Sequence, residues 1–264
     1  MKGGIPYYAP ESVIEGNGFR SNHFHELAEQ EERSFWFRSR NRLILASIKQ
    51  YCPDFSSFLE IGCGTGYVIS AIAEQHPSAR IFGGELFPEG LGFASSRVPQ
   101  ARFMQMDAAK IPFLDEFDLI GAFDVLEHIE EDSLVLIEIK KALTPGGLLL
   151  LTVPQHPWLW SSTDDLACHV RRYTRSDLHS KLEAAGFSIL RSTSFVSLLL
   201  PALCISRLMN SLGHEQSAKP GAELNISSFL NRSLEICMNI EALFIRLGIN
   251  LPIGGSRLII AKHQ

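Results

Sequence analysis

The order of apolar and polar positions divides the middle of the chain into alternating strands and helices. Short apolar runs typical of buried strands occur at residues 58–61, 80–83, 117–123 and 148–153. Apolar residues recur with helical spacing between them, at residues 67–75, 88–97 and 132–143. This alternation, with short connections, predicts an α/β fold with a parallel sheet and right-handed crossovers.

Local signals mark the ends of several elements. His76-Pro77 ends the first of these helices, and Thr144-Pro145-Gly146-Gly147 predicts a turn into the apolar strand LLLLTV. Ser176 is expected to cap a helix that stops at Gly186. The strand SILRST follows, and SRLIIAKH at residues 256–263 alternates as a final strand would.

Two segments lie outside the alternation and define the predicted domains. Residues 1–50 form an N-terminal helical cap with one long helix at roughly 23–51, and residues 195–255 form an apolar helical insert. Residues 51–194 and 256–264 form the main domain. The insert has three open interpretations: a lid over an acceptor, a homodimer face, or a peripheral membrane contact. Its most apolar stretch is too short to be a transmembrane segment.

Composition narrows the class of protein. The chain has 264 residues, 45% of them hydrophobic, which suits one large α/β domain. Its net charge of −5 provides no basic field for nucleic acid, so no nucleic-acid partner is expected. The 5 cysteines are odd in number and form no C-x-x-C, and the N-terminus lacks an apolar signal core. These features predict a reduced, cytoplasmic protein.

A glycine-rich turn, EIGCGTGY, follows the first strand at residues 60–67. Such a turn lets the backbone approach a ligand closely. The dinucleotide fingerprint G-x-G-x-x-G would require a third glycine at position 67, where this chain has Tyr67. Glu60 would repel a phosphate but could orient a cationic amine. The turn therefore predicts a nucleoside ligand without a pyrophosphate, although a purely structural turn remains the alternative.

Acidic residues follow the next strands at the same edge of the sheet. Glu85 ends the second strand about twenty residues after the glycines, where a carboxylate can accept from both ribose hydroxyls. Asp107 ends the third strand, in ARFMQMD, and can accept from an adenine amine. Phe123 and Asp124 follow the fourth strand. S-adenosylmethionine has the amine, ribose and adenine that these residues would bind.

The ordered series EIGCGTG, GGEL, MDAAKIPF, FDLIGAFDVLEHIEED and LTPGGLLLLTVP resembles the class I S-adenosylmethionine-dependent methyltransferases, in particular type 11 and type 12 domains. The resemblance covers roughly residues 55–193 and 256–263. It implies a Rossmann-like, seven-stranded, mostly parallel sheet with helices on both faces, an antiparallel last strand and a helical insert before that strand.

The resemblance also implies where the cofactor binds. The methionine end would contact the glycine turn, the ribose and adenine would contact the acidic strand ends, and the methyl group would face the fourth strand. The predicted cofactor-binding residues are therefore Glu60, Gly62, Cys63, Gly64, Gly66, Glu85, Leu86, Asp107, Ala108, Phe123 and Asp124. Phe123 could equally be plain core.

A hydroxyl acceptor needs a general base, and histidine is the usual choice. The catalytic candidates are His128, His156 and His169. In enzymes that this chain resembles, the loop after the fifth strand faces the acceptor, which favours His156 or His169. The alternative is that all three are structural.

The spacing D-x-x-E-H places Asp124, Glu127 and His128 within one helical turn, which raises the question of a metal. It resembles the E-x-x-E-H of metal-dependent ubiquinone-type O-methyltransferases, with Asp in place of the first Glu. Many methyltransferases carry a similar E-H without metal, so no metal site is predicted.

The stretch HPWLWSSTDDLACHVRRYTRSDL concentrates polar and aromatic residues after the fifth strand. Arginine pairs strongly with carboxylate or phosphate, so an acidic acceptor is one interpretation. Pairing of the arginines with Asp164 and Asp165, which would fix the loop, is the other. The predicted substrate-binding residues are Trp158, Trp160, Arg171, Arg172 and Tyr173.

The N-terminal helix carries Arg38, Arg40 and Arg42. In related enzymes such a helix closes over the cofactor, so one of these arginines could meet the methionine carboxylate. The alternative is surface pairing with Glu29, Glu31 and Glu32.

The predicted function is methyl transfer from S-adenosylmethionine to a small-molecule acceptor, O-directed, with an acceptor that is acidic or sugar-like and partly apolar. A non-enzymatic S-adenosylmethionine-binding module and an N- or C-methyltransferase remain alternatives. A short-chain dehydrogenase would need Tyr-x-x-x-Lys, and a nucleic-acid amino-methyltransferase would need an N/D-P-P-Y/F motif where this chain has FDVL.

Overall fold

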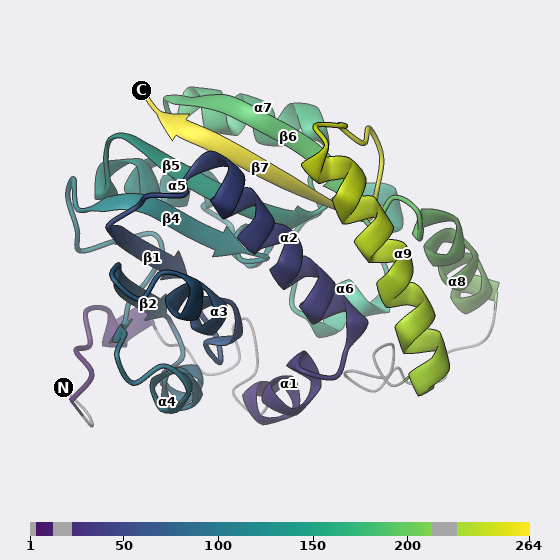
Figure 1. Ribbon diagram of the computed structural model, residues 1–264, viewed down its shortest axis with the longest axis horizontal. Helices are drawn as coiled ribbons and strands as arrows, with labels where there is room; N and C mark the ends of the chain where they lie inside the picture. Colours follow the sequence, from purple (N-terminus) through teal and green to yellow (C-terminus); the bar gives the residue numbers. More distant parts are fainter. Residues whose placement is uncertain (1–3, 13–22, 213–225) are drawn as a thin grey trace.

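The computed structural model describes residues 4–12, 23–212 and 226–264, which are built around one seven-stranded sheet (Figure 1). The strand order is β3-β2-β1-β4-β5-β7-β6. The last strand, β7, is antiparallel to β5 and β6, whereas the remaining neighbours run parallel. The strands are β1 (Ser57–Ile61), β2 (Arg80–Glu85), β3 (Arg102–Gln105), β4 (Phe117–Phe123), β5 (Leu143–Pro154), β6 (Phe187–Phe195) and β7 (Ser256–His263). The predicted Rossmann-like fold is confirmed.

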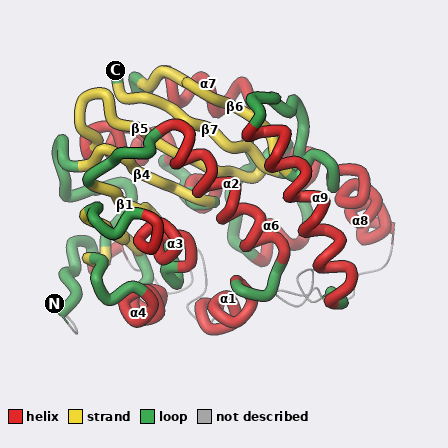
Figure 2. Tube along the Cα trace, in the orientation of Figure 1, coloured by secondary structure: helices red, strands yellow, loops and turns green. Residues whose placement is uncertain are grey.

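Helices cover both faces of the sheet because the central strands are apolar on both sides (Figure 2). One face packs against α2 (Phe35–Tyr51), α3 (Tyr67–Gln75), α4 (Pro88–Arg97) and α9 (Ser228–Arg246). The other face packs against α5 (Asp132–Ala142) and α7 (Arg175–Ala184). Alternate residues of β1 illustrate this division, since Phe58 belongs to the first core and Leu59 to the second.

Shorter elements lie in the connections and in the two added segments. Besides α2 and α9, the added segments contain α1 (His23–Glu31) near the N-terminus and α8 (Leu200–Leu212) in the insert. The connections contain η1 (Pro10–Ser12), η2 (Leu126–His128), η3 (Pro157–Leu159) and α6 (Ser162–Leu166).

The single N-terminal helix predicted at 23–51 is wrong, because the chain forms α1 and α2 with a break between them. Ser34 causes the second start: its Oγ accepts a hydrogen bond from the backbone N–H of Trp36 at 3.3 Å, as an N-cap does. The break lets α1 turn away from α2 and lie beside α4 (Figure 1).

Two further local predictions are corrected. Thr174, and not Ser176, caps α7: its Oγ1 accepts from the backbone N–H of Asp177 at 3.1 Å. Residues 144–147 do not precede the fifth strand but form an irregularity within β5, where pairing with β4 is interrupted between Leu143 and Leu148. The expected stop of α7 at Gly186 is confirmed, with φ of +84° just beyond the helix.

The N-terminal segment and the insert pack against each other, α2 beside α9 (Figure 1). Glu235 of α9 forms ion pairs with Arg38 and Arg42 of α2. Asn231 accepts from the backbone N–H of Phe35 at 2.8 Å. Two of the three N-terminal arginines therefore pair with the insert, rather than with Glu29, Glu31 or Glu32.

The insert presents apolar side chains to solvent. On α9, Phe229 is 84% exposed, and Ile236, Ile240 and Leu243 are also exposed. Within the part of the chain that the structure describes, no helix is long and apolar enough to cross a bilayer.

Candidate functional site

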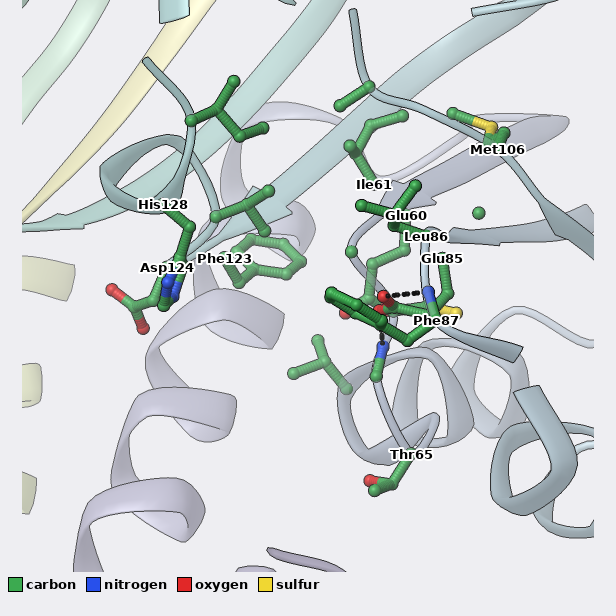
Figure 3. Close-up of a pocket in the computed structure, with 18 of the residues that line it drawn as sticks. Glu60, Ile61, Thr65, Glu85, Leu86, Phe87, Met106, Phe123, Asp124 and His128 are labelled. Carbon is green, nitrogen blue, oxygen red and sulfur yellow. Dashed lines mark hydrogen bonds between the residues drawn. The ribbon is translucent and has the colours of Figure 1, made fainter. Parts of the chain in front are cut away.

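A cavity of about 510 Å³ opens at the carboxyl ends of β1, β2 and β4 (Figure 3). This is the edge at which ligands of open α/β sheets bind. All but one of the predicted cofactor-binding residues line it, namely Glu60, Gly62, Cys63, Gly64, Glu85, Leu86, Asp107, Ala108, Phe123 and Asp124. Gly66 is not among the lining residues.

The three glycines of the turn serve different purposes, although each has a positive φ of +66°, +53° or +80° in chain order. A Cβ on Gly62 would lie 2.5 Å from Val125 Cγ2, and one on Gly66 would lie 2.9 Å from Ala94 Cα. A Cβ on Gly64 would have nothing within 4 Å. Gly66 therefore permits the packing of α3 on α4, while Gly64 is the glycine with free space beside it at the cavity.

Glu85 is bound to the glycine turn and to its own strand end. Its Oε2 accepts from the backbone N–H of Gly64 at 3.0 Å, and its Oε1 accepts from that of Phe87 at 3.1 Å (Figure 3). Burial raises the pKa of Glu85, while these backbone donors oppose the rise. Since a carboxylate has about four acceptor sites, two bonds leave capacity for hydroxyl donors of a ligand.

Asp107 lies two residues beyond β3, which ends at Gln105, so the third strand is shorter than predicted. Its Oδ1 accepts from the backbone N–H of Ala109 at 2.9 Å. The half-buried Asp107 and Ala108 lie on the cavity wall, where a base edge could meet them.

Two acidic side chains, Glu60 and Asp124, lie on either side of Phe123 (Figure 3). Glu60 is 3% exposed, and its Oε2 has no hydrogen-bond partner among the described residues. Burial raises the pKa of Glu60 well above its ordinary value, and the positive charge of Arg40 opposes the rise. Arg40, from α2, forms an ion pair with Asp124, whose φ is +58°. A cationic group of a ligand beside Glu60 would relieve the cost of its burial.

Helix α1 is fastened to the glycine turn by a contact that the sequence did not suggest. Glu31, predicted as a surface acid, is 4% exposed and accepts from Thr65 Oγ1 at 2.6 Å. Arg97 of α4 donates to the same carboxylate at 2.9 Å. Burial raises the pKa of Glu31, and Thr65 and Arg97 oppose the rise. Glu31 itself lines the cavity, so α1 forms part of its wall.

The three candidate histidines occupy different positions. Of the three, His128 lines the cavity. Burial, followed by the neighbouring His169, lowers the pKa of His128 to about 4, so its ring is neutral at neutral pH. His169 contacts the ring of His128 edge-on, with centroids 4.8 Å apart. His156, with φ of +64°, stacks on Trp158 and is not a lining residue.

None of the predicted substrate-binding residues lines this cavity. Tyr173 is buried and donates to Asp132 at 2.7 Å, and Arg171 pairs with the same carboxylate at 2.9 Å. Arg172 pairs with Asp164 at 2.7 Å. Trp158 and Trp160 are 57% and 38% exposed. The contacts of the two arginines hold the loop to its neighbours, and a role in acceptor binding stays a prediction.

Comparison with known proteins identifies the central part of the chain. A family model described as a methyltransferase domain matches residues 59–151. A probable S-adenosylmethionine-dependent methyltransferase of Mycolicibacterium smegmatis is 27% identical over 161 residues, which are 60% of this chain and 61% of that protein. Trans-aconitate 2-methyltransferase of an Azoarcus species is 30% identical over 103 residues, 39% of this chain and 41% of the relative. The chain thus spans less than two thirds of the length of these relatives.

Solved structures share the fold over a larger part of the chain. The crystal structure of the [4+2]-cyclase SpnF has a TM-score of 0.58 at 20% identity and covers 88% of this chain and 83% of its own. At that identity the likeness shows the fold and not the reaction. The family model shows that residues 59–151 form a methyltransferase domain, the relatives share this part of the chain, and the sheet order is that of the class I fold, so S-adenosylmethionine is the cofactor of this domain.

Proposed function

We propose that this protein transfers the methyl group of S-adenosylmethionine to a hydroxyl group of a small-molecule acceptor. When bound, the cofactor supplies a methyl group made electrophilic by a sulfonium. The protein then has to align an acceptor oxygen with that methyl group in a site from which water is excluded, so positioning accounts for much of the rate.

The residues of the cavity fit the cofactor at one end. Glu85 retains acceptor capacity for a ribose diol after its two backbone bonds, and Asp107 lies on the wall for the adenine edge. The unpartnered Oε2 of the buried Glu60 suits an ammonium group. The free space beside Gly64 leaves room for the chain of the methionine.

The acceptor would bind at the other end of the cavity, around Asp124 and His128 (Figure 3). Methylation of a hydroxyl oxygen is supported by His128. Its Nδ1 is buried and has no hydrogen-bond partner among the described residues. A hydroxyl acceptor must lose its proton as the new bond forms, and the neutral imidazole of the lining residue His128 offers a nitrogen that can accept it, although its lowered pKa makes it a weak base.

The lining favours a neutral, partly apolar acceptor over an acidic one. Phe37, Tyr67 and Ile129 supply apolar wall. An acidic acceptor would need a positively charged partner. Arg40 supplies the guanidinium group among the described lining residues, and it already pairs with Asp124. Because one relative is named a trans-aconitate 2-methyltransferase, an acidic acceptor is the competing hypothesis.

The experiment is a turnover assay with purified protein, S-adenosylmethionine and a panel of sugar-like alcohols, phenols, carboxylic acids and amines, in which S-adenosylhomocysteine is measured. We expect turnover with a hydroxyl acceptor. We also expect His128→Ala to lower kcat at least about 100-fold, the usual contribution of a proton-transfer group. His179→Ala is the matched control, since His179 bonds Ser192 away from the cavity.

Binding of S-adenosylmethionine is measured by calorimetry on the same samples. We expect both variants to bind the cofactor as the wild type does. Tight cofactor binding with no turnover of any acceptor would favour the non-enzymatic module, and turnover of amines alone would favour N-methylation.

A further inference from the structure

Three potential metal ligands adjoin the cavity through His128, the member of the group that lines it. Glu127 and His128 belong to η2, whereas His169 follows α6. Each offers one ligand atom, and these atoms all lie within 4.8 Å of one another. The chain brings the loops together through the backbone: Val170 N–H donates to the carbonyl of Glu127 at 2.7 Å. The third member, His169, is one that the D-x-x-E-H spacing did not include.

Glu127 is the feature of this group that most needs an explanation. It is 0% exposed, and neither of its carboxylate oxygens has a hydrogen-bond partner among the described residues. Buried polar groups nearly always have a hydrogen-bond partner. Burying an ionised carboxylate without a partner costs roughly several kcal/mol, because the ion loses its hydration. The nearby negative charge of Asp124 increases the cost, and the positive charges of Arg40 and Arg172 offset part of it. A cation beside Glu127 would remove it.

The imidazole of His169 is oriented as a metal ligand usually is. His169 Nδ1 lies 2.9 Å from Asp164 Oδ1, and Asp164 is 1% exposed and also held by Arg172. This contact assigns the proton to Nδ1 and leaves the lone pair on Nε2, as in carboxylate–histidine–metal arrangements. A positive φ of +58° at Cys168 sets the direction of the chain just before His169. The Nδ1 of His128 has no partner within the described structure.

We propose that Glu127, His128 and His169 bind a divalent transition metal ion beside the cavity, behind His128. Two imidazoles and one carboxylate suit zinc and its first-row neighbours, whereas Mg²⁺ prefers an all-oxygen set. Ligand atoms around a tetrahedral zinc lie about 3.3 Å apart, given bonds of about 2.0–2.1 Å. The widest pair would therefore close by about 1.5 Å on binding, which side-chain rotation allows.

A bound metal would change the role of His128 in the proposed reaction. The proposal that the metal binds is independent of that reaction. With the Nδ1 lone pair on the ion, the ion and not the imidazole would favour loss of the acceptor's hydroxyl proton. That proton would pass to solvent. The metal is therefore tested on the full chain without cofactor or acceptor, so the two proposals can fail separately.

The experiment combines metal analysis with a cobalt titration. The protein is stripped by dialysis against a chelator, and Co²⁺ is added while its visible absorption is recorded. We expect one equivalent to bind with the intense bands of a low-coordinate site, to be displaced by Zn²⁺, and to be unaffected by excess Mg²⁺. Protein purified without chelator should contain near-stoichiometric transition metal.

Variants locate the site. His169→Ala and Glu127→Gln should each weaken Co²⁺ binding at least about 100-fold, and Asp164→Asn about 10- to 100-fold, as expected when a residue that orients a ligand is changed. His179→Ala should bind as the wild type does. Circular dichroism and calorimetry with S-adenosylmethionine establish that each variant is folded.

Two results would overturn the proposal. The first is wild-type protein that, once stripped, shows no cobalt spectrum and contains no transition metal as purified. The second is a cobalt spectrum that survives in folded His169→Ala and Glu127→Gln proteins. The first result needs no variant, so the test holds even where a variant fails to fold.

Discussion

Glu85→Gln tests directly whether the carboxylate at the end of β2 binds the cofactor. The change keeps the shape of the side chain and replaces one oxygen by an NH₂ group. The wild-type carboxylate accepts from the backbone N–H groups of Gly64 and Phe87, at 3.0 and 3.1 Å. A ribose diol would add two further donors to it. The variant has one oxygen left, so its capacity falls below what the backbone and the ribose require.

The loss in binding follows from the charge. A hydrogen bond to an ionised group contributes about 1.5–3 kcal/mol, against about 0.5–1.5 kcal/mol for a neutral bond. Two ribose bonds that lose this difference amount to about 2–3 kcal/mol. At about 1.4 kcal/mol for each factor of ten, the affinity for S-adenosylmethionine should fall about 30- to 140-fold.

Stability should change much less than affinity. An N–H that loses its acceptor costs about 1–3 kcal/mol, whereas removal of a buried charge, whose desolvation raises the pKa of Glu85, acts in the opposite direction. We expect Tm to stay within a few degrees, since about 1 kcal/mol shifts Tm by about 2–4 °C in a domain of this size.

The assay is isothermal titration calorimetry with S-adenosylmethionine, paired with a thermal melt of each sample. Glu89→Gln is the control, because Glu89 is exposed in the first turn of α4 and does not line the cavity. If folded Glu85→Gln protein binds the cofactor within about threefold of the wild type, the carboxylate is not the ribose partner and the assignment of the acidic strand ends is refuted.

Two further predictions concern stability. Gly66→Ala should lower the free energy of unfolding in urea by about 2–5 kcal/mol, because the new Cβ sits at a positive φ and overlaps Ala94. Gly64→Ala should lower it by about 1–2 kcal/mol, because only the positive φ opposes the change. Equal losses would show that the Ala94 contact is unimportant. Hydrogen bonds from Arg38 and Arg42 lower the pKa of Glu235 to about 2. The ionised Glu235 therefore adds about 1–2 kcal/mol to the free energy of unfolding above the ordinary pKa of about 4.5, and this contribution is lost as pH falls toward about 2. Acid unfolding of Glu235→Gln should therefore lack this loss, and an unchanged acid limb would count against the pair.

The alternation of strands and helices predicted the parallel part of the sheet and the edge at which the cavity lies. Parallel strands all end at one edge, so residues after successive strands, such as Glu85 and Asp124, had to meet there. Period and turn residues also predicted α3 and α4 to the residue. The residues that cap helices were harder to predict from the sequence. Thr174 and Ser176 are both good N-cap residues, and the hydrogen bond to Asp177 shows that Thr174 is the cap. The start of α2 at Ser34 likewise becomes evident from its hydrogen bond to Trp36.

The tertiary structure decided which distant side chains meet. Glu31 at Thr65, Arg40 at Asp124, and His169 beside Glu127 and His128 are pairings between segments with no shared period. Such contacts depend on the paths of loops, including the left-handed residues Asp124 and Cys168, and on how α1 and α2 lie over the sheet edge. Periodicity fixes which face a residue lies on, because it follows from the local backbone. Charge and ligand partners follow from the packing of the whole chain, because burial sets which groups must find one another.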